Sequence, residues 1–157
     1  MKVRMFDSAA PLSPHCLSKL ESRLNITLPD DYRNFLLKYN GGFPNPSVFR
    51  FKGKSGPYTD SCVDWFLSVY KGEYHNFETT FLRTKSERIR LPADLVAIGH
   101  DPGGNWICIA VSGPHRGSVY FWDHENEAPN EEAPWYRNVH LIADSFDEFL
   151  DSLSDRV

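Results

Sequence analysis

Apolar residues recur every three or four positions in two segments near the start of the chain, which is the spacing of an amphipathic helix. Leu17, Leu20 and Leu24 predict the first helix, over residues 14–24. The pair Ser13-Pro14 begins it, because serine is a favoured N-cap residue and proline suits the first helical position. We therefore expect this helix to pack a leucine face on the core.

A second helix is predicted directly after Leu28-Pro29-Asp30-Asp31. Proline fits the start of a helix, and the two acids suit the positive end of its dipole. Its apolar face consists of Tyr32, Phe35, Leu36 and Tyr39. Asn40-Gly41-Gly42 supplies the C-terminal stop, since asparagine and glycine adopt the left-handed backbone that ends many helices. This is the clearest helix signal in the chain.

Beyond Pro46 the pattern changes to short apolar runs rich in β-branched and aromatic residues, which indicate strands. The predicted strands are residues 48–51, 62–70, 95–98, 106–111, 118–122 and 139–143. Strong turn signals at residues 101–105 and 113–117 separate three of them. We therefore expect those three strands to form an antiparallel meander.

Two later segments return to helical spacing. The first has apolar residues at Tyr74, Phe77, Phe81 and Ile89, although two adjacent threonines weaken the pattern. In the second, Ser145 is the expected N-cap, and the core-facing residues are Phe146, Phe149, Leu150 and Leu153. Helices, then strands, then a closing helix predict the α+β class. We expect a single domain over residues 1–157, with a mainly antiparallel sheet packed against N-terminal and C-terminal helices.

The composition fits one intracellular globular domain. The 157 residues are 41% hydrophobic and 14% aromatic, which supplies enough large side chains for a core and excludes a disordered chain. No apolar run approaches the roughly 20 residues that cross a bilayer, and none follows the basic N-terminus as in a signal peptide. Cys16, Cys62 and Cys108 are widely spaced and odd in number, which suits reduced thiols in the cytoplasm.

Charge is divided unevenly along the chain. Residues 1–90 carry 14 Lys+Arg and 9 Asp+Glu, whereas residues 91–157 carry 3 and 12. The formal net charge of −4 argues against direct nucleic-acid binding through a basic face. The acids gather in two stretches: Asp123, Glu125, Glu127, Glu131 and Glu132, and Asp144, Asp147, Glu148, Asp151 and Asp155. Such a half can attract a basic protein partner, or it can simply keep the protein soluble.

The sequence contains no constellation typical of catalysis. It has no glycine-rich phosphate loop, and none of its six histidines pairs with a cysteine at zinc-ligand spacing. Asp101 and Asn105 resemble part of a calcium loop, but Ser112 stands where that loop needs glutamate, which favours a plain turn. Cys108 fits an inert buried thiol, and His100 fits a turn better than an acid–base pair. We predict no catalytic residue, no metal site and no cofactor.

Two side-chain clusters are candidates for binding. Trp122, Trp135 and Tyr136 border the first acidic stretch. Aromatic anchors beside charged groups are typical of protein interfaces, although each is alternatively a structural cap on the sheet edge. The second cluster is basic and consists of Arg83, Lys85, Arg88 and Arg90. It could contact phosphate or an acidic partner, but a solvated helix end is the simpler interpretation.

Residues 28–42, Leu-Pro before a helix that Asn-Gly-Gly closes, resemble the opening signature of the SUKH superfamily. That family includes the yeast cell-wall-assembly regulator of the Smi/Knr type and many bacterial proteins. Residues 95–109 resemble its central hairpin, residues 117–125 its next strand and residues 145–150 its closing helix. The resemblance covers about residues 13–153.

This resemblance implies a non-enzymatic binding domain with a SUKH-like fold. Single-domain bacterial members are typically immunity proteins, each of which neutralises a cognate polymorphic toxin, often a nuclease, delivered by neighbouring cells. We therefore expect a cytoplasmic immunity protein that binds a basic toxin domain stoichiometrically, without direct nucleic-acid or membrane binding. The alternative is a regulatory scaffold like the eukaryotic member. The candidate toxin-binding residues are Trp122, Asp123, Glu125, Glu127, Glu131, Glu132, Trp135 and Tyr136.

Overall fold

A computed structural model describes residues 3–52, 57–86, 91–126 and 136–155. The helices are α1 (Pro14–Leu24), α2 (Asp30–Tyr39), α3 (Phe77–Thr84) and α4 (Phe146–Ser152). The strands are β1 (Arg4–Phe6), β2 (Phe43–Asn45), β3 (Val48–Lys52), β4 (Tyr58–Cys62), β5 (Trp65–Phe66), β6 (Leu95–His100), β7 (Trp106–Ala110), β8 (Val119–Trp122) and β9 (Val139–Ala143). A short 3-10 helix, η1 (His124–Asn126), follows β8. The predicted α+β class is confirmed.

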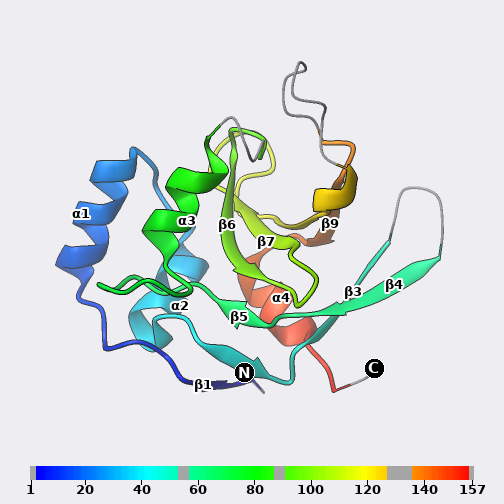
Figure 1. Cartoon of the computed structure of the whole chain (residues 1–157), viewed down its shortest axis with the longest axis horizontal. Helices are drawn as coiled ribbons and strands as arrows, with labels where there is room; N and C mark the ends of the chain where they lie inside the picture. The colour runs from blue at the N-terminus through cyan, green and yellow to red at the C-terminus, as the bar shows by residue number, and fades with distance from the viewer. Residues whose placement is uncertain (1–2, 53–56, 87–90, 127–135, 156–157) are drawn as a thin grey trace.

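Five antiparallel strands form the central sheet, in the order β5-β6-β7-β8-β9. Strands β1 and β2 form one separate pair, and β3 and β4 form another. Figure 1 shows α1, α2 and α3 to the left of the central strands, and the β3–β4 hairpin projecting to the right. The predicted meander is confirmed, because β6 pairs with β7 and β7 with β8.

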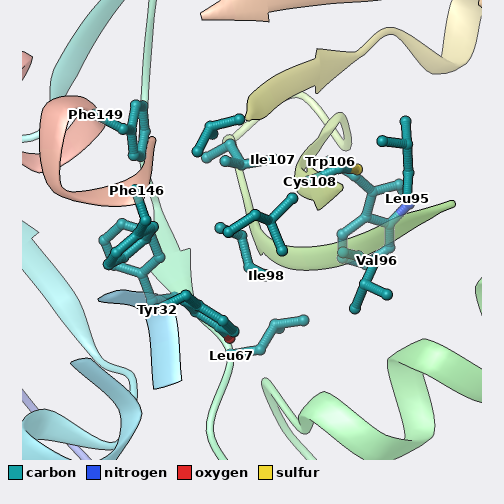
Figure 2. Close-up of a cluster of buried hydrophobic side chains, with 14 of the residues drawn as sticks. Tyr32, Leu67, Leu95, Val96, Ile98, Trp106, Ile107, Cys108, Phe146 and Phe149 are labelled. Carbon is teal, nitrogen blue, oxygen red and sulfur yellow. The ribbon is translucent and has the colours of Figure 1, made fainter. Parts of the chain in front are cut away.

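Aromatic side chains from α2 and α4 pack together on the central sheet. The ring centroids of Tyr32 and Phe146 lie 5.1 Å apart in an edge-to-face arrangement at 71°. Figure 2 shows Tyr32, Phe146 and Phe149 facing Ile98 and Ile107 of the sheet, and all five side chains are fully buried. Each aromatic pair of this kind adds roughly 0.5–1.5 kcal/mol beyond its area burial. The first and last parts of the chain are thus joined through one core.

The predicted helix starts are confirmed by their caps. The Ser13 hydroxyl accepts a hydrogen bond from the Cys16 backbone N–H at 3.1 Å. The Ser145 hydroxyl does the same for Glu148, also at 3.1 Å. Each cap satisfies one of the backbone donors that a helix leaves open at its first turn.

The strand predicted over residues 62–70 is wrong. Strand β4 ends at Cys62 and β5 covers only Trp65–Phe66. Three consecutive residues, 66–68, are buried, so side chains do not alternate between two faces as they do in a strand. The apolar character of this segment therefore reflects burial in an irregular connection.

The helix predicted around residues 74–89 is shorter than the segment over which apolar residues recur at helical spacing. It spans Phe77–Thr84, and the Asn76 side chain caps it by accepting a hydrogen bond from the Thr79 N–H at 3.0 Å. Tyr74 precedes this cap, and Ile89 lies outside the described residues. Asparagine at an N-cap fixes where the helix begins.

Asn40-Gly41-Gly42 ends α2 as predicted and also joins it to two other segments. Asn40 has a left-handed backbone with φ 50°. Its amide nitrogen donates to the carbonyls of Ala10 at 2.8 Å and Val69 at 2.9 Å, and its amide oxygen accepts from the Val69 N–H at 2.8 Å. At Gly41, whose φ is 75°, an added Cβ would lie 2.3 Å from the Ser68 hydroxyl. The backbone therefore approaches too closely here for any side chain.

Candidate protein-binding site

The candidate site is the acidic segment, which we define as residues 123–136, between β8 and β9; it includes η1. The structure describes residues 123–126 and 136 of it. Of the predicted binding residues, Glu127, Glu131, Glu132 and Trp135 lie outside the described residues. Asp123, Glu125 and Tyr136 are described, and Glu125 and Tyr136 are exposed.

Trp122 is a core residue and not the exposed anchor that its position beside the acids suggested. Its side chain is only 2% exposed, and it lies opposite Trp106 on β7 and Val139 on β9. Strand β8 is buried on both faces, because the neighbouring Phe121 stacks on Phe51 of the β3–β4 hairpin at 4.6 Å. Trp122 is therefore part of the core next to the site, and it cannot contact a partner in this conformation.

The two ends of the acidic segment are held together by Asn138. The Asp123 N–H donates to the Asn138 carbonyl at 2.9 Å, and the Asn138 side chain donates to the Asp123 carbonyl at 2.9 Å. The Asp123 carboxylate accepts from the Glu125 N–H at 3.0 Å, which shapes the first turn of η1. Because Asn138 is buried, these bonds give the segment a fixed base on the sheet.

A second set of bonds ties η1 to the turn between β6 and β7. The Asn105 amide oxygen lies 3.1 Å from the His124 backbone nitrogen and 2.6 Å from its imidazole Nδ1. The Asn105 amide nitrogen donates to the Asp101 carboxylate at 3.0 Å. That carboxylate also accepts from the Gly103 and Asn105 N–H groups and from the Ser61 hydroxyl. Asp101 is thus the acceptor that organises the turn, as the plain-turn interpretation expects.

Tyr136 lies at the other end of the acidic segment, where its ring is 45% exposed. Its hydroxyl donates a hydrogen bond to the carboxylate of Asp94, next to β6. An exposed aromatic ring with its polar end held in place is suited to a protein interface, because little side-chain entropy is lost on binding. Tyr136 is therefore a candidate anchor for a protein partner.

The two described members of the basic cluster, Arg83 and Lys85, make different contacts. The Lys85 ammonium donates to the carbonyls of Ala93 at 3.2 Å and Leu95 at 2.7 Å, and desolvation lowers its pKa. Lys85 is exposed, as expected of a solvated helix end, and its ammonium also ties the end of α3 to β6. The Arg83 guanidinium instead lies over the Trp106 ring, 5.4 Å from its centroid. Arg88 and Arg90 lie outside the described residues.

Cys108 is buried, as the sequence predicts, whereas Cys62 is partly buried and Cys16 is exposed. Cys108 is fully buried in β7, and burial raises the pKa of its thiol well above the usual range. Cys62 is partly buried, and its pKa is raised by desolvation and by the nearby Asp101 and Asp64 carboxylates. Both shifts favour the protonated thiol at neutral pH.

Sequence reasoning missed a cluster of aromatic and histidine side chains beside α3. His75 and His100 are 25 positions apart, yet His75 Nδ1 lies 3.0 Å from His100 Nε2. The His75 ring stacks on Trp65, with centroids 4.5 Å apart. The one local signal was His100 at the end of a predicted strand, and nothing in the spacing pointed to His75.

None of the helices described is long and apolar enough to cross a membrane. Across the same parts of the chain, no group of three or more His, Cys, Asp or Glu side chains is arranged to hold a metal ion.

Comparison with known proteins identifies the family. Residues 11–152 match the SMI1 / KNR4 family (SUKH-1), so the chain belongs to that family. The chain is also similar to the SPbeta prophage-derived uncharacterized protein YokK of Bacillus subtilis (strain 168), with 30% identity over 153 residues, covering 88% of this chain and 73% of that protein. The SUKH resemblance predicted from the sequence is therefore confirmed.

Proposed function

We propose that the protein is an immunity protein, which binds a cognate polymorphic toxin stoichiometrically and blocks it. The observation that carries this proposal is the family match, which extends over residues 11–152. The SUKH-1 family includes immunity proteins of polymorphic toxin systems. We propose further that the protein acts in the cytoplasm and without catalysis, by binding alone.

The acidic segment is the surface that we propose for toxin binding. It holds an exposed Glu125 at its first end and an exposed Tyr136 at its last end, and Asn138 hydrogen-bonds to Asp123 at its base. A toxin that acts on nucleic acid needs a basic surface for phosphate, so carboxylates on this segment are complementary to it. The segment would then occupy the path of the nucleic acid.

A regulatory scaffold that binds proteins of the same cell is the second candidate, since the family is also named for the eukaryotic regulators SMI1 and KNR4. The two functions differ in their partner. A scaffold binds a housekeeping protein, whereas an immunity protein protects cells that express one particular toxin domain.

A pull-down with growth rescue tests the proposal. Tagged protein is recovered from its native host, and bound proteins are identified by mass spectrometry. We expect recovery of a toxin C-terminal domain, and rescue of cells that express this domain. Recovery of housekeeping partners alone, with no rescue from the toxin encoded beside the gene, would favour the scaffold.

Charge reversal tests the surface. In one variant Glu125→Lys and Glu127→Lys reverse two acids of the acidic segment. A matched control carries Asp151→Lys and Asp155→Lys, the same charge change at exposed positions in α4 and after it. We expect the first variant to slow association at low salt and weaken protection, with the control close to wild type. Equal protection by both would remove the acidic segment from the proposal.

A further inference from the structure

A pocket of about 340 Å³ lies between α3 and the ends of β6 and β7. Its lining includes His75, His100, Arg83 and Trp106, and it contains none of the described residues of the acidic segment. We call it the paired-histidine pocket. Its volume is at the lower end of the range of ~300–1,000 Å³ for ligand sites, which suits a single side chain.

Hydrogen bonding fixes the tautomers of the two histidines. His100 Nδ1 lies 3.5 Å from the Asp64 carboxylate and 3.3 Å from the Asp101 carbonyl, both acceptors, so this nitrogen carries a proton. In a neutral ring, His100 Nε2 is then an acceptor, and His75 Nδ1 donates to it across 3.0 Å. This leaves His75 Nε2 as the open nitrogen, with no hydrogen-bond partner among the described residues.

Packing holds this nitrogen in place. The His75 ring lies nearly parallel to Trp65, with an interplanar angle of 13°. His75 itself has a left-handed backbone with φ 52°, which is uncommon for a residue with a side chain. The ring is thus preorganised, and any proton that the pair gains is added at His75 Nε2.

The charges around the pocket nearly cancel at neutral pH. Arg83 supplies one positive charge, and its guanidinium forms no ion pair with the described residues. Instead it makes a cation–π contact with the Trp106 ring. Glu73 lines the pocket with one negative charge, and Asp64 is on the far side of His100. A proton on His75 therefore decides whether the pocket is neutral or positive.

We propose that the paired-histidine pocket binds the carboxylate of a glutamate or aspartate side chain of the protein partner. The carboxylate accepts hydrogen bonds from protonated His75 Nε2 and from Arg83, and the Trp106 ring packs against the methylene groups. Binding takes up a proton, so affinity rises as the pH falls through the pKa of the free pair, by at most tenfold per pH unit. That the carboxylate belongs to a toxin rests on the proposed function, whereas the chemistry of the pocket does not.

NMR of the imidazole groups tests the pocket with two matched probes, N-acetylglutamate amide and N-acetylglutamine amide. They have the same shape, and only the first has a charge. We expect the glutamate probe to shift the His75 and His100 resonances with a Kd on the order of 10 mM, several-fold tighter at about pH 5.5 than at about pH 7.5. Equal shifts with both probes, or none with the glutamate probe at about 100 mM, would overturn the proposal.

Three variants sharpen the test. His75→Asn removes the ring, and asparagine accepts the left-handed backbone at this position. Arg83→Gln changes an exposed side chain, so it leaves the fold intact. Both variants should lose most of the binding of the glutamate probe. In Arg83→Gln the remaining binding should keep its pH dependence. His115→Asn, at an exposed turn, is the control and should bind as wild type.

The pocket and the proposed function fail separately. If the protein neutralises its toxin but the glutamate probe does not bind, the inference about the pocket is wrong and the immunity function stands. If the probe binds but no toxin is neutralised, the function is wrong and the pocket stands.

Discussion

The imidazole Nδ1 of His124 lies 2.6 Å from the amide oxygen of Asn105, 19 positions earlier in the chain. This contact joins η1, where the acidic segment begins, to the turn between β6 and β7. The amide nitrogen of Asn105 faces the other way and donates to Asp101. One side chain therefore couples the proposed binding surface to the turn between β6 and β7.

Replacing Asn105 should loosen this connection. In Asn105→Ala the Asp101 carboxylate loses a donor and His124 loses its acceptor, so we expect a loss of about 1–2 kcal/mol in the free energy of unfolding. Urea unfolding measures it. Asn34→Ala, at an exposed position of α2, is the control and should not lower stability. A midpoint for Asn105→Ala as high as that of the control would contradict this role.

Asn40 should matter through its side chain and not through its backbone. Asn40→Gly keeps the left-handed conformation but removes the three hydrogen bonds that the buried Asn40 amide makes to Ala10 and Val69, and should cost about 2–4 kcal/mol. The matched control is Asn25→Gly. Asn25 ends α1 with φ 54° and is exposed, so its change should stay within about 0.5 kcal/mol. Similar unfolding midpoints for the two variants would refute this account of the Asn-Gly-Gly motif.

Tyr32 has a fully buried hydroxyl that finds no hydrogen-bond partner in the described parts of the chain. Burial raises the pKa of this phenol far above its usual value, which keeps it neutral. Tyr32→Phe removes an unpaired polar group and keeps the ring, so stability should be unchanged or higher by up to about 1–2 kcal/mol. Thermal and urea unfolding beside the half-buried Tyr39→Phe variant measure the difference. A clear loss of stability would show that the hydroxyl has a partner.

The paired histidines should make stability depend on pH. Desolvation and the neighbouring His100 lower the pKa of His75, while Asp64 acts in the opposite direction. The unfolded chain therefore binds a proton on His75 more tightly than the folded chain does. The free energy of unfolding does not depend on His75 above about pH 6.5, and it falls as the pH drops below that value. Urea midpoints at about pH 7.5 and about pH 5.5 should differ less for His75→Asn than for wild type. An equal decrease in both proteins would exclude His75 as the cause, and His115→Asn should behave as wild type.

Local chemistry explains why much of the fold could be predicted from the sequence. Ser13 and Ser145 cap helices through neighbours three residues away, so the signal and its structural effect lie in the same short segment. Strand β4 was missed for the opposite reason. Its residues Tyr58–Cys62 are mostly polar and exposed, and only pairing with β3 makes them a strand. That pairing is a tertiary contact that no local pattern contains.

In the candidate site, too, features set by neighbouring residues were predicted and features set by tertiary contacts were not. Glu125 and Tyr136 were candidates because they lie in or beside the acidic stretch of the sequence, and the structure shows that both are exposed. Trp122 was misjudged, because a tryptophan beside acids looks like an anchor when the hairpin that covers β8 is unknown. The contact between His75 and His100 depends on the path of residues 67–76 around Asn76, whose amide donates to the carbonyls of Tyr70 and Gly72. Sequence spacing does not reveal such a path.

The most direct test of the central claim is a titration of toxin activity with the purified protein. A fixed amount of the toxin domain recovered in the pull-down is mixed with increasing amounts of the protein, and residual toxin activity is measured. The account predicts a linear decrease that reaches zero at one equivalent, because inhibition comes from binding. Complete inhibition at far less than one equivalent would indicate catalysis, and undiminished activity at a large excess would contradict the immunity function.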